Sequence, residues 1–202
     1  MTNKKIILAS GSEGRLKILR KMMIEPDYII IPNVPEPIIK GEKPRQMSIR
    51  VAKAKMEKAL SIIKERVDID KNSILIVGDT VACMGNRILD KALNDEDVVR
   101  YIKMMNGKNS RIYSTTCVVD ILTGRKSIKT AETRLKLKYL QQDEIDFLVK
   151  TKQGIGCAGG YSIDNFACCL FEKIIGSYTN IVGLPATQVY NALRSFGYKF
   201  SC

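Results

Sequence analysis

Asp79 follows four aliphatic residues, Ile74 to Val77, and one glycine. A continuous aliphatic run this short predicts a strand that is buried on both faces of a sheet. A carboxylate beside such a strand needs a cation or hydrogen-bond donors, because burying an unpaired charge is costly. Asp79 is therefore either a turn residue at the end of the strand or a site residue held by a rigid sheet, and the run alone favours neither.

Residues around Ser12 have the chemistry of an anion site. An apolar run over 5–9 predicts a strand, a small polar turn follows, and apolar residues then recur at helical spacing from Leu16. The start of a helix offers free backbone N–H groups and a favourable dipole to phosphate, and Ser12 and Arg15 suit such a ligand. The structural alternative is the more common arrangement: Ser12 caps the helix and Arg15 lies in its exposed first turn.

Three further charged residues could complete such a site. Glu36 lies in a loop with three prolines, and rigid loops can present ligands to metals, although most acids in such loops are solvated. Lys55 lies on a long amphipathic segment over 45–66, where most lysines are also solvated. Lys91 ends the second arm of an expected hairpin over 74–91, which would bring it toward the same end of the sheet as Asp79.

The chain has no histidine and six cysteines without a C-x-x-C pair. Closed zinc sites built from Cys and His pairs are therefore not expected. Ser-His and Cys-His nucleophilic mechanisms are excluded, so a general base must be a carboxylate, Lys, Tyr or Cys. The cysteines are expected to be buried, reduced thiols.

The formal net charge of +12 favours anionic partners such as phosphates, nucleic acid or a membrane surface. The lysines are spread through the chain, which argues against nucleic acid and agrees with an ordinary solvated surface. No apolar stretch approaches the ~20 residues that a membrane span needs. The apolar part of the N-terminus is too short for a secretion signal, so a cytoplasmic protein without a membrane partner is expected.

The remaining pattern alternates strands with helices and predicts an α/β protein with a mixed sheet. The expected strands cover 5–9, 28–31, 74–83, 87–91, 111–122 and 133–139, and the expected helices cover 16–23, 45–66, 94–105, 143–150 and 186–196. The glycine-rich segment 154–160 matches neither the dinucleotide fingerprint nor the P-loop. No linker interrupts the pattern, so residues 1–202 are expected to form a single domain.

Five stretches, in order along nearly the whole chain, follow a known set of motifs. They are residues 8–15 (L-A-S-x-S-P-R-R), 50–55 (R-L-A-x-x-K), 78–81 (A-D-T-V), 89–92 (L-G-K-P, in part) and 176–185 (G-S-Y-x-N-V-V-G-L-P). Together they resemble the Maf family of nucleoside triphosphate pyrophosphatases, which is related to the inosine-triphosphate pyrophosphatases. Each motif is weak alone, but the ordered set is specific.

The resemblance implies an elongated mixed β-sheet flanked by helices, in two lobes with a nucleotide cleft between them, commonly as a homodimer. It implies hydrolysis of a nucleoside triphosphate to a monophosphate and pyrophosphate with a divalent metal, Mg²⁺ or Mn²⁺. Carried over by position, it assigns Asp79 as the catalytic carboxylate, Glu36 and Asp79 as metal ligands, and Ser12, Arg15, Lys55 and Lys91 as phosphate-side residues.

Three departures from the family pattern concern the substrate. Gly14 stands in place of the first of two arginines, and Glu13 in place of proline. Asp164 stands in place of glutamine in G-A-Y-G-I-Q, and an acid there could alter base recognition or metal binding. The Asp79-Thr80 pair is typical of the branch that prefers dTTP and UTP, whereas residues 156–159 are similar to the branch that prefers 7-methyl-GTP. We expect a pyrimidine substrate, with 7-methyl-GTP as the alternative.

Two other classes of function remain. The family has been associated with septum formation, so a nucleotide-binding regulator of cell division with weak turnover is one alternative, favoured by Gly14 and Asp164. A nucleic-acid-binding module is motivated only by the charge, and the chain offers no recognisable motif or aromatic stacking platform for it. The enzyme is the leading hypothesis.

Overall fold

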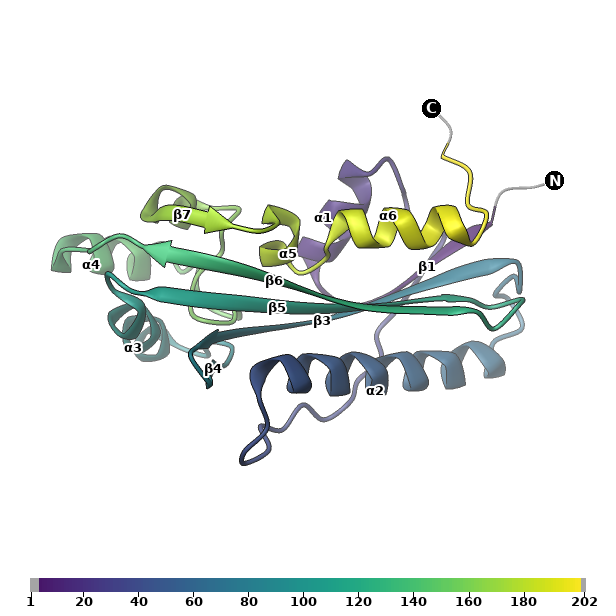
Figure 1. The fold of residues 1–202 in the computed structure, drawn as a ribbon, viewed down its shortest axis with the longest axis horizontal. Coiled ribbons are helices and arrows are strands. Elements are labelled where there is room, and N and C mark those ends of the chain that lie inside the picture. The colour runs from purple at the N-terminus through teal and green to yellow at the C-terminus, as the bar shows by residue number, and fades with distance from the viewer. Residues whose placement is uncertain (1–3, 201–202) are drawn as a thin grey trace.

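Seven strands form one mixed β-sheet in the computed structural model, which describes residues 4–200 (Figure 1). The order across the sheet is β2-β1-β3-β5-β6-β7, and β4 pairs with the end of β3. β1 is parallel to β2 and β3, and the other pairs are antiparallel, so the predicted mixed α/β sheet is confirmed. The strands are β1 (Lys5–Ala9), β2 (Tyr28–Ile30), β3 (Ser73–Met84), β4 (Arg87–Leu89), β5 (Asn109–Asp120), β6 (Lys126–Leu137) and β7 (Phe171–Ile175).

Helices cover both faces of the sheet. The long α2 lies below it and α1 and α6 lie above it, while α3 and α4 lie at its other end (Figure 1). Among residues 4–200, no helix combines the length and apolar character that crossing a membrane requires. The helices are α1 (Glu13–Lys21), α2 (Pro44–Glu65), α3 (Asp95–Met105), α4 (Gln142–Lys150), the 3₁₀ helix η1 (Phe166–Leu170), α5 (Tyr178–Val182) and α6 (Ala186–Ser195).

The aliphatic run in β3 is buried on both faces, as predicted. Ile74 and Ile76 pack against α1 and α6, whereas Leu75 and Val77 pack against α2, because successive strand residues point to opposite faces. Each such buried side chain contributes about 1.5–3 kcal/mol of hydrophobic stabilisation. The strand is therefore a rigid support for the polar residues that follow it.

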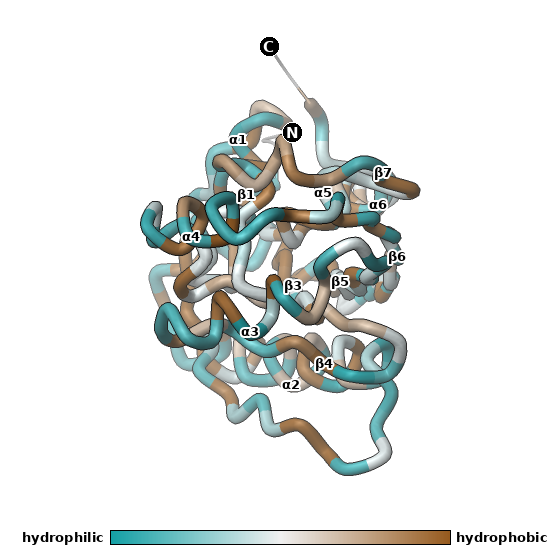
Figure 2. Tube along the Cα trace, turned by 90° about the vertical axis from the view of Figure 1, so that its left-hand side faces the viewer, coloured by the Kyte–Doolittle hydropathy of each residue, from teal (hydrophilic) through white to brown (hydrophobic). Residues whose placement is uncertain are grey.

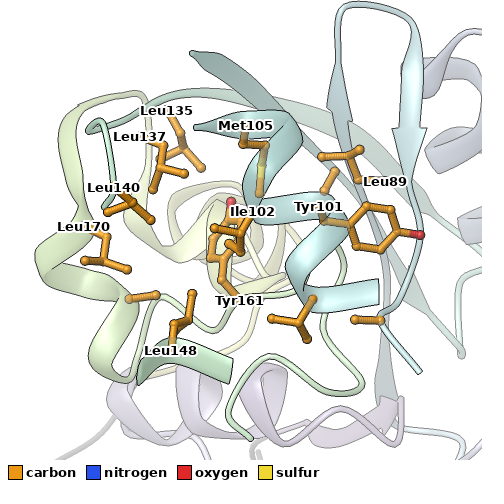
Figure 3. Close-up of a cluster of buried hydrophobic side chains, with 14 of the residues drawn as sticks. Leu89, Tyr101, Ile102, Met105, Leu135, Leu137, Leu140, Leu148, Tyr161 and Leu170 are labelled. Atoms are coloured by element: carbon orange, nitrogen blue, oxygen red, sulfur yellow. The ribbon is translucent and has the colours of Figure 1, made fainter. Parts of the chain in front are cut away.

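A separate apolar core fills the other end of the molecule. Figure 3 shows Ile102 and Met105 of α3 facing Leu135 and Leu137 of β6, with Tyr161 among them. Tyr161 belongs to the segment that follows the glycine-rich residues 154–160, and together with Ala167 and Leu170 it anchors this segment in the core.

The connection between β2 and α2, residues 31–43, is the most exposed part of the site-forming chain. We call it the 31–43 loop. It lies at the bottom of both whole-molecule views, away from the sheet (Figure 1, Figure 2). Ile38 and Ile39 within it are about half exposed, so apolar packing contributes little to holding the loop in place.

Two predictions from the sequence need correction. β6 begins at Lys126 rather than 133, because its first seven residues are half-buried or exposed and are held by pairing with β5, which leaves no apolar pattern to detect. Burial is confirmed for Cys83 and Cys117, and Cys157 is half-buried. Burial is wrong for Cys168 and Cys169, which are exposed on η1, where Ala167 and Leu170 are the buried residues. Cys202 lies outside the described residues.

Candidate active site

The site lies at a break in the pairing of β3. One edge of β3 pairs with β1 from Ser73 to Val77 and with β4 from Ala82 to Met84. Between these two pairings, residues 78–81 have only β5 as a strand partner within the part of the chain that the structure describes. A cavity of about 350 Å³ opens there, and it is lined by both Asp79 and Thr80. The short partner strands thus expose the polar residues of an otherwise buried strand.

Three of the predicted residues form a charged cluster at this cavity. Lys55 Nζ lies 2.8 Å from Asp79 Oδ1 and 2.8 Å from Glu36 Oε1. Asp79 is 3% exposed, and the Lys55 side chain is 13% exposed. Asp79 therefore lies buried within a continuous strand and is not a turn residue, and Lys55 supplies the compensating charge that its burial requires. Glu36 reaches the same ammonium group from the 31–43 loop.

Arg15 lies at the same end of the cavity and is buried. Its guanidinium donates hydrogen bonds to Gly183 O at 2.9 Å, Ser10 Oγ at 2.9 Å and Thr80 Oγ1 at 3.3 Å. Burial lowers the pKa of Arg15, and the charges of Asp79 and Glu36 oppose that shift. These hydrogen-bond partners are neutral oxygens, so none of them neutralises the positive charge of Arg15. The guanidinium can therefore attract an anion in the cavity.

Ser12 caps α1, which confirms the structural alternative for this residue, but the same alternative is wrong to place Arg15 in an exposed first turn, because the guanidinium is buried. The Ser12 hydroxyl accepts from the Arg15 backbone N–H at 3.5 Å, and it also lines the cavity. The cap leaves the start of α1 facing the same space as the Arg15 guanidinium. We call Ser12, Arg15, Glu36, Lys55 and Asp79 together the charged end of the site.

A chain of hydroxyls and an amide, all buried except the half-buried Thr80, supports Arg15 on the side away from the cavity. Thr80 Oγ1 is 2.9 Å from Ser114 Oγ, and Ser114 Oγ donates to Asn180 O at 2.9 Å. Asn180 Nδ2 donates to Thr133 Oγ1 at 2.8 Å and to Ile112 O at 3.2 Å. Thr80 and Asn180 lie within the motifs of residues 78–81 and 176–185, and Ser114 begins a Ser-Thr-Thr run in β5, but none of these patterns predicts the bonds between them. These bonds join three strands, β3, β5 and β6, to α5 and fix the wall of the cavity.

The opposite wall is formed by Lys91 and residues 156–165, which we call the glycine-rich end. Lys91 is exposed, lines the same cavity as Asp79 and forms an isolated backbone bridge with Ala158. It makes no ion pair with Asp79 among the described residues. Asp164 is also exposed and accepts a hydrogen bond from Tyr178 Oη. Burial, together with the Asp164 charge, raises the pKa of Tyr178 to about 12.

Close packing between α1 and α5 explains why position 14 is a glycine. A Cβ atom at this position would lie 2.9 Å from Val182 O and 3.1 Å from Val182 Cγ1. Since the nearest obstacle is a backbone atom of α5, a side chain here requires α1 or α5 to shift. The departure from arginine therefore removes a cation and also allows close packing of these two helices.

The carboxylates fit a magnesium-like ion bound together with a phosphate substrate. The described residues contain no group of three or more His, Cys, Asp or Glu side chains arranged to hold a metal. Glu36 and Asp79, however, converge on one ammonium group. Mg²⁺ is usually held by one or two carboxylates, several waters and the substrate phosphates, so two converging carboxylates suffice.

Comparisons with known proteins give a consistent result. A model of the family described as Maf-like protein matches residues 5–196. A dTTP/UTP pyrophosphatase of Rhodopseudomonas palustris (strain HaA2) is 38% identical over 194 residues, which cover 96% of this chain and 93% of that protein. A nucleoside triphosphate pyrophosphatase of Rickettsia rickettsii (strain Sheila Smith) is 38% identical over 203 residues, covering 98% and 91%. One of the same description from Rickettsia felis is 38% identical over 201 residues, covering 98% and 95%.

Proposed function

Because the chain belongs to the Maf-like protein family, we propose that it hydrolyses the α–β phosphoanhydride of a nucleoside triphosphate, releasing a monophosphate and pyrophosphate. The observation that carries this proposal is the charged end itself. A carboxylate that is 3% exposed is paired with a lysine and faces the same cavity as a buried arginine with neutral partners. Phosphoanhydride hydrolysis needs such a carboxylate for water and such cations for phosphate oxygens.

We assign Asp79 the role of positioning the attacking water. Lys55 Nζ donates a hydrogen bond to Asp79 Oδ1. Asp79 Oδ2 can therefore accept a hydrogen bond from a water directed at the α-phosphorus. The β3 strand limits the motion of this carboxylate, so the carboxylate itself does not have to be ordered at each turnover. Arg15, the N-terminal N–H groups of α1 and Lys91 bind the phosphate oxygens and stabilise the charge that develops on them.

Glu36 and Asp79 are the residues that would hold the divalent metal. The metal would supply Lewis-acid neutralisation of the phosphate oxygens. Before substrate arrives, the ammonium group of Lys55 keeps the carboxylates of Glu36 and Asp79 close together. Mg²⁺ and Mn²⁺ both suit oxygen ligands of this kind.

For the base, we propose a pyrimidine, as in dTTP or UTP. Thr80 directly follows Asp79, as in the branch of the family with that preference, and one relative is named a dTTP/UTP pyrophosphatase. The alternative, 7-methyl-GTP, is favoured by residues 156–159 and by the exposed carboxylate of Asp164 at the glycine-rich end. A carboxylate accepts hydrogen bonds only, and guanine presents N–H donors that it could bind.

We also propose that residues 1–202 form one domain with two lobes. The cavity lies between the core beside α2 and α6 and the core beside α3 and α4, and β3 and β5 run through both. The homodimer implied by the resemblance stays a prediction.

The test is pyrophosphate release from a panel of canonical and modified triphosphates, with and without Mg²⁺ or Mn²⁺. We expect metal-dependent release of pyrophosphate and monophosphate, with dTTP and UTP among the best substrates. Preference for 7-methyl-GTP would reverse the base assignment. Nucleotide binding without release from any member of the panel would contradict the enzyme and favour the regulatory alternative.

A further inference from the structure

Glu36 is the one member of the charged end that comes from an exposed loop. Its side chain is 36% exposed, and it reaches the site only because the 31–43 loop holds it 2.8 Å from Lys55. A loop with few buried contacts samples many conformations, and ordering it costs conformational free energy. Something must therefore hold the loop if Glu36 is to be in place before a ligand arrives.

Arg50 of α2 makes the contacts that hold it. Arg50 Nε donates to Glu42 Oε1 at 2.7 Å, and Arg50 Nη2 donates to Glu42 Oε2 at 2.7 Å. Nη2 also donates to the backbone carbonyl of Pro37 at 2.8 Å. The guanidinium fork thus ties α2 to the residue after Glu36 and to the end of the loop at once.

The pair is better placed than a typical surface ion pair. The Glu42 side chain is 11% exposed and the Arg50 side chain 32% exposed, and a two-pronged arginine–carboxylate pair fixes orientation as well as distance. The hydrogen bond with Arg50 lowers the pKa of Glu42, so both partners are charged at neutral pH. Arg50 itself does not line the cavity that Asp79 and Glu36 line.

We infer that Arg50 is a positioning residue: by clamping Pro37 and Glu42 to α2, it presents Glu36 to the site in the conformation that binds the divalent metal. The inference rests on the proposed function only in its assumption that Glu36 is a metal ligand. Without the contacts of Arg50, each metal-binding event must also order the 31–43 loop. The free energy spent on ordering weakens the apparent affinity for the metal. Turnover of the fully loaded enzyme is little changed, because the same geometry is reached once metal is bound.

A purely structural role for Arg50 makes a different prediction, and the chain supplies a matched control. Arg20 and Glu25 form the same kind of two-pronged pair, with Nε–Oε2 at 2.8 Å and Nη2–Oε1 at 2.9 Å. Both side chains are more than half exposed, and neither residue lines the cavity. Arg20→Ala therefore removes equivalent chemistry away from the loop.

The experiment compares wild type, Arg50→Ala, Arg50→Lys, Glu42→Ala, Glu36→Gln and Arg20→Ala. Binding of Mn²⁺ alone is followed by electron paramagnetic resonance, and hydrogen exchange is measured over residues 33–42. We expect Arg50→Ala and Glu42→Ala to speed exchange in this segment and to weaken Mn²⁺ binding by about tenfold, a typical effect of losing an orienting partner. Arg50→Lys, which keeps the charge but loses the fork, should fall between, and Arg20→Ala should match wild type.

Two results separate positioning from other roles. Adding Arg50→Ala to Glu36→Gln should weaken Mn²⁺ binding no further, because the clamp acts through Glu36. In pyrophosphate release, Arg50→Ala should raise the metal concentration for half-maximal rate by about tenfold, with kcat at saturating metal within about twofold of wild type. Unchanged Mn²⁺ affinity in Arg50→Ala, additive losses in the double variant, or no Mn²⁺ binding to wild type would overturn the inference. A wild type that binds Mn²⁺ but releases no pyrophosphate would contradict the proposed function alone.

Discussion

The two ends of the cavity are built by different means. At the charged end, side chains from α1, the 31–43 loop, α2 and β3 are joined by ion pairs and hydrogen bonds of about 2.8–3.3 Å, and Asp79 and Arg15 are buried. At the glycine-rich end, Lys91 and Asp164 are exposed, and Tyr161 is the residue of 156–165 that is buried in the apolar core of α3 and β6, with Ala158 packed against that core. The first end is fixed by strand and helix except at Glu36, which lies on the 31–43 loop, and the second end is a loop wall.

This difference suggests a division of labour. Groups that act on a transition state must be held rigidly, because small displacements cost large factors in rate. Groups that select a base tolerate variation, since loops accept substitutions that a sheet does not. Changes at the charged end should therefore remove turnover, whereas changes at the glycine-rich end should redistribute it among substrates.

The largest expected effect is that of Asp79→Asn. Losing the water-positioning carboxylate should lower kcat by about 10³-fold or more, equivalent to roughly 4 kcal/mol of transition-state stabilisation. The measurement is steady-state pyrophosphate release, with circular dichroism to verify the fold.

Asp120→Asn is the matched control for that variant. Asp120 is another buried acid of the same sheet, 2% exposed and paired with Lys4 at 3.2 Å, but it does not line the cavity. The Asp120→Asn variant should be less stable than wild type but have the same kcat. Near-normal turnover in Asp79→Asn would remove the basis for placing the chemistry at the charged end.

Gly183→Ala should have an intermediate effect. Gly183 has φ of +113°, and a Cβ there would lie 3.1 Å from Thr80 Oγ1, while its carbonyl accepts from Arg15. Displacing this support should raise KM for the triphosphate by about tenfold, in line with a lost orienting contact, and lower stability by roughly 1–2 kcal/mol.

Gly124→Ala is the control that separates the effect of backbone strain from the effect on Arg15. Gly124 also has positive φ, +71°, but nothing lies within 4 Å of its Cβ position. The variant should lose comparable stability with KM unchanged. Equal KM values in the two glycine variants would show that Arg15 does not depend on this contact.

Asp164→Gln should change the preference between substrates but not the kcat for the preferred substrate. A glutamine amide both donates and accepts hydrogen bonds, which suits the mixed edge of a pyrimidine better than a carboxylate does. We expect the ratio of kcat/KM for dTTP over 7-methyl-GTP to rise by about tenfold, with the larger kcat within about fivefold of wild type. Tyr178→Phe, which frees the Asp164 carboxylate, should lower the same ratio. A proportional loss on both substrates would place Asp164 with the charged end instead.

The smallest effect concerns the thiols. Burial raises the pKa of Cys83 to about 11 and of Cys117 to about 12, so almost no thiolate forms on either at pH 8. Iodoacetamide should therefore label the exposed Cys168 and Cys169 much faster, as followed by peptide mass spectrometry. Their modification should change kcat less than about twofold, because η1 contributes no residue to the cavity lining. Labelling of Cys117 at the same rate would show that the sheet opens, contrary to its role as a rigid support.

The strand and helix that carry the charged end could be predicted from the sequence, and the contacts that assemble it could not. The aliphatic run before Asp79 and the spacing of Lys55 on a long helix follow from patterns with a clear period, which predict β3 and α2 correctly. The Lys55–Glu36 contact depends on the path of an irregular loop, and the buried Thr80–Ser114–Asn180 chain joins residues far apart in sequence. Neither has a local signal, because hydrogen bonds across 34 or 66 positions are set by the register of strands and not by neighbouring residues.

Hydrolysis of dTTP in H₂¹⁸O identifies the phosphorus atom that water attacks. If the charged end directs water to the α-phosphorus, each thymidine monophosphate carries one ¹⁸O atom, the pyrophosphate carries none, and Asp79→Asn abolishes the labelled product. Mass spectrometry of the two products gives the answer. Label in the pyrophosphate, or release of orthophosphate with a nucleoside diphosphate, would contradict the account.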